Sequence, residues 1–267
     1  MLDSRNSHLQ PDPPRDLHDL IQFVQAQYRQ RMESPQHCAL TSRAFALNAP
    51  YRFSEVSSLS PGRPGHGSPL LLFSGSRRKG LDEIRAGFVR ANEEHAWIYI
   101  PLIGVWIDDT TEVEDGGVAA DPFLRTLLMR AYREIEVFHT HPDGLYRNLH
   151  EQGQLPETWP IIAATPSRGD QFGAAMLEDH AGPRAKLLSH VISSFGVTAY
   201  QRTEFFRFDD VAVGGPFDVA FESIRPDADP VSEITRIIHD LEQTIAWQSA
   251  SGETHATWRL SFEPFSE

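Results

Sequence analysis

The stretch EIEVFHTHP, residues 134–142, constrains both the fold and the chemistry of this chain. Its apolar and β-branched residues predict a buried strand, and Pro142 predicts where that strand ends. Side chains alternate between the two faces of a strand, so His139 and His141 point the same way. Two imidazoles at this spacing can converge on one metal ion at a strand end, where loops and sites collect.

The same alternation places Glu134, Glu136 and Thr140 on the opposite face of the strand. The two acids nearest to the histidines are thereby set aside as metal ligands or bases. One alternative is that the histidines only make structural hydrogen bonds. The H-x-H pair favours a metal site instead, because imidazole is the commonest metal ligand in proteins.

A catalytic zinc ion keeps three protein ligands and an open position, so a third ligand is needed. The segment SRGD, residues 167–170, offers Ser167 and Asp170 three residues apart at a predicted helix start. Asp170 can give a carboxylate oxygen to zinc, and Ser167 can donate a hydrogen bond to a developing oxyanion. Either residue can instead cap the helix. His150 is an alternative third ligand.

Outward from this strand, helices and strands mix along the chain without an internal repeat. The pattern predicts an α/β (α+β) fold, with a mixed β-sheet flanked by helices. Periodicity and capping signals predict helices at residues 16–33, 79–94, 121–133, 167–180 and 229–247. Apolar runs predict strands at 69–75, 95–107, 134–141, 185–201, 203–213 and 256–265, with a turn at 108–117 and polar irregular chain at 143–160.

The formal net charge of −13 disfavours nucleic-acid partners, because phosphate backbones repel an acidic chain. The densest basic run, Arg77-Arg78-Lys79, is short and predicts a solvated turn. No run of about 18 apolar residues occurs, so we expect no membrane span. The first residues lack the pattern of a secretory signal.

The single cysteine, Cys38, rules out an intramolecular disulfide and suits a reducing cytoplasm. It also excludes structural zinc sites built from several thiolates. Any metal must therefore be held by histidines and carboxylates, and we expect zinc in a cytoplasmic protein.

The motif H-T-H-P followed by S-R-G-D resembles the signature of the JAMM (MPN+, Mov34/JAB) zinc metallopeptidases, and the flanking elements follow the family's order. The resemblance implies a cytidine-deaminase-like core at 68–210, an N-terminal extension at 1–67 and a C-terminal helix and strand at 211–267. One departure is large, because 25 residues separate His141 from Ser167 where the family has a short loop. We expect an insertion at about 143–160 that borders the site and binds or gates substrate.

The resemblance also implies a role for each matching residue. His139, His141 and Asp170 would hold zinc, a zinc-activated water would be the nucleophile, and Ser167 would stabilise the oxyanion.

The family's general base is a glutamate at the start of the strand after the first helix. The matching place is ANEEHAW, residues 91–97, so the base is Glu93 or Glu94, with Glu83 and Glu112 as weaker candidates. The glycine that the family has three residues after this glutamate is absent, since Ala96 and Trp97 stand at the two possible positions.

The implied function is a peptidase or isopeptidase acting on a protein or peptide, such as a ubiquitin-like or sulfur-carrier-like protein. Two other classes stay open: a non-catalytic MPN-like scaffold, and an unrelated metal hydrolase that uses H-x-H. The remaining histidines form no second recognisable motif, which disfavours the unrelated hydrolase. The sequence does not indicate the oligomeric state.

Overall fold

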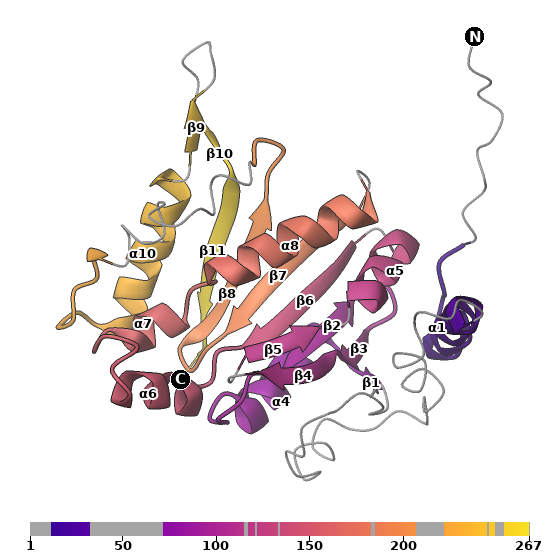
Figure 1. Cartoon of the computed structure of the whole chain (residues 1–267), viewed down its shortest axis with the longest axis horizontal. Coiled ribbons are helices and arrows are strands. Elements are labelled where there is room, and N and C mark those ends of the chain that lie inside the picture. Colours follow the sequence, from indigo (N-terminus) through magenta and orange to yellow (C-terminus); the bar gives the residue numbers. More distant parts are fainter. Residues whose placement is uncertain are drawn as a thin grey trace.

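The computed structural model describes residues 12–32, 72–114, 117–120, 122–132, 134–182, 185–206, 222–244, 246–248 and 254–266. A seven-stranded sheet lies at its centre, with helices packed against it (Figure 1). In spatial order the strands are β1 (Leu72–Ser74), β3 (Val105–Asp108), β2 (Ala96–Ile100), β6 (Glu134–Thr140), β7 (Lys186–Ile192), β8 (Gly196–Arg202) and β11 (Trp258–Pro264). The predicted α+β class, with a mixed sheet flanked by helices, is confirmed.

The described helices are α1 (Leu17–Met32), α4 (Arg77–Phe88), α5 (Pro122–Tyr132), α6 (Asp143–Glu151), α7 (Trp159–Ala163), α8 (Arg168–Ala181) and α10 (Pro230–Thr244). Two separate strand pairs join β4 (Thr110–Glu114) to β5 (Gly117–Ala120) and β9 (Ala246–Gln248) to β10 (Thr254–Ala256).

Strand β6 is central to the sheet. It runs antiparallel to β2 and parallel to β7, whereas the other neighbouring strands of the sheet are antiparallel. A parallel pair requires a crossover connection, and here the crossover holds α6, α7 and α8. The register pairs His139 with Ala96 of β2 and with Val191 of β7. The end of β6 therefore meets the start of β2, next to the junction where a base is predicted.

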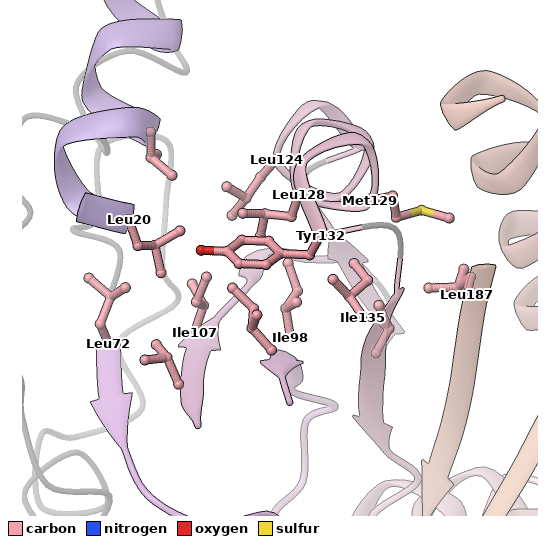
Figure 2. Packing of buried hydrophobic residues seen from close by; sticks show 14 residues of the cluster. Leu20, Leu72, Ile98, Ile107, Leu124, Leu128, Met129, Tyr132, Ile135 and Leu187 are labelled. Atoms are coloured by element: carbon pink, nitrogen blue, oxygen red, sulfur yellow. The ribbon is translucent and has the colours of Figure 1, made fainter. Parts of the chain in front are cut away.

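Alternate residues of β6 pack on opposite faces of the sheet. Ile135 belongs to a cluster with Leu124 of α5 and with residues of α1 and β2 (Figure 2). Phe138 packs on the other face against Trp106, beneath α4. Burying one such side chain contributes about 1.5–3 kcal/mol to folding. Packing on both faces fixes the strand and thereby the direction in which His139 points.

Both ends of the chain contribute to this same unit. β11 pairs with β8 over its full length, and α10 packs Ile234 and Leu241 against Trp258 of β11. At the other end, Leu20 and Val24 of α1 join the cluster beneath α5. Among the described helices, none has both the length and the apolar character needed to cross a membrane.

Several local expectations were wrong. The turn predicted at 108–117 is largely the β4–β5 pair, and the polar stretch 143–160 contains α6 and the start of α7. Residues 203–206, expected in a strand, form a turn after β8. The basic run 77–79 lies in the first turn of α4 rather than in a solvated turn.

Other boundaries moved by only a few residues. The strand predicted at 95–107 is split into β2 and β3 by a turn that starts at Pro101, where the sequence predicts a bend. The helix predicted at 79–94 starts at Arg77 and ends at Phe88, which leaves the segment ANEE in a junction. Residues 1–11 and 33–67 of the expected N-terminal extension, and residues 207–213 of the strand expected at 203–213, lie outside the described part of the chain.

Candidate metal centre

The two histidines of the H-x-H pair meet at the end of β6. His139 is 6% exposed and His141 is 2% exposed, and their Nε2 atoms lie 3.1 Å apart. The backbone N–H of His141 donates to the carbonyl of Ile192, which extends the parallel pairing with β7 beyond the strand end. The sheet therefore holds both imidazoles with their Nε2 atoms converging on one point.

Asp170 reaches the same point from the first turn of α8. One carboxylate oxygen lies 3.1 Å from Nε2 of His139, and the other lies 3.5 Å from Nε2 of His141. Zinc bonds of about 2.0–2.1 Å in a tetrahedral site place ligand atoms about 3.3–3.4 Å apart. The three ligand atoms therefore have a spacing that suits zinc. Two imidazoles and one carboxylate are also a suitable donor set for zinc, and a tetrahedral ion with these three ligands has a fourth position for water.

The charge of Asp170 is maintained despite its burial. Burial opposes ionisation, but His139 and His141 outweigh it and hold the pKa of Asp170 well below its usual value. For His141 too, burial opposes the charged form, while Asp170 and Glu94 raise its pKa. A carboxylate that stays ionised beside two imidazoles is the form that can ligate a cation.

The crossover supplies a hydrogen-bond partner that orients His141. Its Nδ1 lies 3.0 Å from the carbonyl oxygen of Ala163, the last residue of α7. A carbonyl can only accept, so Nδ1 carries a hydrogen, and in the neutral ring Nε2 presents its lone pair to the cluster. The segment between the motif halves is therefore part of the centre itself.

Ser167 takes the capping role, one of the two roles that the sequence left open. It is the N-cap of α8: its Oγ accepts from the backbone N–H of Asp170 at 3.2 Å, and Asp170 accepts from the backbone N–H of Ser167 at 2.6 Å. This capping box fixes the Asp170 carboxylate beside the histidines. Because Oγ only accepts in the cap, the cap does not use the hydroxyl hydrogen.

Of the candidate bases, Glu94 is the one whose carboxylate lies beside His141, at 3.7 Å from Nε2. The β2–β6 register brings it there, because Ala96 pairs with His139. Burial lowers the pKa of His95, the residue after Glu94, and the charges of Asp108 and Glu93 partly oppose this. The ring of His95 packs with α4 and β2.

The other sequence candidates lie elsewhere. Glu83 is in α4, and Glu112 is in β4. His150, the alternative third ligand, lies in α6 with its Nδ1 2.9 Å from the carbonyl of Leu155. Within the described residues, the cluster with metal-ligand spacing consists of His139, His141 and Asp170.

The alternation of side chains along β6 excluded Glu136 as a metal ligand or base. Its contacts lie on the face of the sheet that α4 covers. Its carboxylate is 2.8 Å from Nε of Arg77 and 2.8 Å from Nε2 of His190, whose ring stacks on Phe138. Burial opposes ionisation, yet these two partners lower the pKa of Glu136. Glu136 therefore makes its contacts on the face of the sheet opposite to that of His139.

Tyr146 of α6 is a site residue that sequence reasoning missed. Its ring lies 5.0 Å from the ring of His141, tilted by 32°. Burial, together with Glu94 and Asp170, raises the pKa of Tyr146 well above its usual value, so the hydroxyl remains a donor. A signal was present, because Pro142 and Asp143 are typical of a helix start.

Gly144 lets α6 lie directly against the junction that carries Glu94. A Cβ at Gly144 would lie 2.6 Å from the carbonyl oxygen of Ala91 and 2.2 Å from Oδ1 of Asn92. We expect Gly144→Ala to lower the free energy of unfolding by about 1–3 kcal/mol, because the Ala91 backbone has to shift. Urea denaturation measures this difference.

Gly173→Ala in α8 is the matched control, because a Cβ there would have no atom within 4 Å. It is expected to be neutral or to stabilise the helix by up to about 1 kcal/mol. Equal stability of the two variants would show that α6 does not depend on this close approach.

Comparisons of the chain with protein-family models, with curated proteins and with solved structures found no match. The chemical interpretation therefore depends on the residues of the site and their geometry.

Proposed function

We propose that this chain is a zinc-dependent peptidase or isopeptidase of the JAMM type. It would hydrolyse an amide bond in a protein or peptide, for which a ubiquitin-like or sulfur-carrier-like tail is the leading substrate class. The observation that carries the proposal is the meeting of His139, His141 and Asp170 with Glu94, although they come from three separate segments.

The donor set supports zinc in particular. Two imidazoles and one carboxylate are a ligand combination found in catalytic zinc sites, and the three residues leave a position for water. The hydrogen bond from His141 to the carbonyl of Ala163 is the outer support that zinc-binding histidines usually have.

When bound, zinc acts as a Lewis acid that activates water near neutral pH and polarises a carbonyl. Glu94 then accepts the proton of the attacking water and gives it to the leaving nitrogen. The hydroxyl of Ser167 donates to the oxygen on which negative charge develops. Tyr146 covers one face of His141 and limits the access of bulk water to that ligand.

Metal analysis of the purified chain, combined with a cleavage assay, tests the proposal. We expect about one zinc per chain and hydrolysis of a dye-labelled amide at the end of a ubiquitin-like tail, lost with a chelator and restored by zinc. A chain that binds zinc but cleaves no amide would favour the non-catalytic scaffold. A chain that binds no metal would overturn the proposal.

A further inference from the structure

A cavity of about 640 Å³ opens beside the candidate metal centre. It lies between α5 and α8, above β6, β7 and β8, and its wall includes the metal-site residues His139 and Asp170. Its volume falls within the range of about 300–1,000 Å³ that is usual for ligand pockets. A molecule in this cavity would touch the residues that hold the metal.

Apolar side chains dominate the lining of the cavity. Phe172 and Met176 of α8 lie on its wall and are 49% and 36% exposed. They are two of the three large hydrophobic side chains that are exposed among the described residues, the third being Leu102. Exposed apolar groups that gather at one cavity beside a site indicate a binding surface.

The charged groups in the wall already have protein partners. Nε of Arg125 donates to the buried carboxylate of Asp109 at 2.5 Å, and Arg130 donates to the carbonyl of His180 at 2.6 Å. The charge of Arg125 is offset by the Asp109 carboxylate, and the wall also contains the Asp170 carboxylate, which repels an anion. An apolar occupant displaces only water and matches the lining.

We infer that this cavity receives the bulky apolar side chain of a substrate residue next to the scissile amide. The inference rests on the proposed function and narrows its substrate class to amides that have a large aliphatic or aromatic residue on one side. The continuity of the wall with His139 and Asp170 places this side chain beside the reacting bond.

Gly173 gives a direct way to block the cavity. It lies in the wall within α8, and a Cβ built there has no contact within 4 Å. Gly173→Leu therefore projects a side chain into the cavity, and it stabilises the helix because leucine is a better helix former than glycine. Gly173→Ala adds one methyl group only, and Leu102→Ala removes an exposed apolar group outside the cavity.

The test measures the binding of fluorescent hexapeptides by anisotropy. The hexapeptides carry phenylalanine, leucine, glycine or aspartate on one side of the central amide, and a second set carries them on the other side. The full-length Glu94→Gln chain is used as purified, so that peptides stay intact. We expect phenylalanine or leucine in one set to tighten binding by about tenfold or more over glycine and aspartate. Gly173→Leu in the same background removes this preference, while Gly173→Ala and Leu102→Ala keep it.

Equal binding of all peptides in both sets, or a preference that Gly173→Leu leaves intact, would overturn the inference. Cleavage of the same peptides by the chain with Glu94 intact judges the proposed function separately. If the chain cleaves the peptides without preferring apolar residues, the inference about the cavity is wrong and the proposed peptidase function stands. Apolar-selective binding without any cleavage removes the peptidase proposal, and the cavity is then a binding site for apolar peptide side chains.

Discussion

Replacing His139 or His141 with alanine is expected to abolish stoichiometric zinc binding and amide cleavage together. Each substitution removes one of the three proposed ligands and leaves Asp170 with a single imidazole partner. Loss of an outer-shell partner already costs about 10–100-fold in metal affinity, so loss of a direct ligand is expected to exceed about 100-fold. Competition with a chromophoric chelator measures the affinity, and circular dichroism checks that the chain remains folded.

His150→Ala is the matched control for these two variants. His150 was the alternative third ligand, but its ring contacts the carbonyl of Leu155 within the crossover. We expect this variant to keep its zinc and most of its activity. Zinc loss in His150→Ala, or zinc retained at full affinity after His139→Ala, would contradict the assignment of the three ligands.

Changing Glu94 to glutamine is expected to lower kcat by about 10²–10⁴-fold while zinc stays bound. Glutamine keeps the size of the side chain but cannot take up the proton of the attacking water. The Glu94 carboxylate lies beside His141 without being part of the ligand triad, so metal content should not change. Steady-state kinetics and metal analysis of the same preparation measure both effects.

Glu93→Gln provides the comparison, because the two glutamates are neighbours in one junction. The carboxylate beside His141 belongs to Glu94, so replacing Glu93 should change kcat by no more than a few-fold. If the two variants were equally impaired, or if only Glu93→Gln lost activity, the base would be wrongly assigned.

The alternation of side chains along β6 was predictable because it is a local property of a strand. It requires only that residues 134–140 be extended, and their apolar composition indicates this. The same local reasoning set Glu136 aside, and its contacts with Arg77 and His190 lie on the opposite face. The capping signal at Ser167 was likewise local, and it explains why the Asp170 carboxylate has a fixed position.

The outer parts of the centre were not predictable in the same way. The contact of His141 with the carbonyl of Ala163 depends on how α7 packs, and any residue type provides a carbonyl. The helices of 143–160 were missed because the stretch is polar, which masks helical periodicity. The β4–β5 pair was missed although the alternation TTEVE followed by an Asp-Gly dipeptide is a hairpin signal.

The turn between α6 and α7 gives the crossover a point at which its length is free to vary. Gly153 lies there, exposed, with a positive φ of 74° and no atom close to where a Cβ would be. Tyr146 precedes this turn and Ala163 follows it, so the two contacts with His141 are anchored on either side. We therefore expect that residues can be inserted at or removed from Gly153 at a small entropic cost, while the contacts of Tyr146 and Ala163 with His141 are kept.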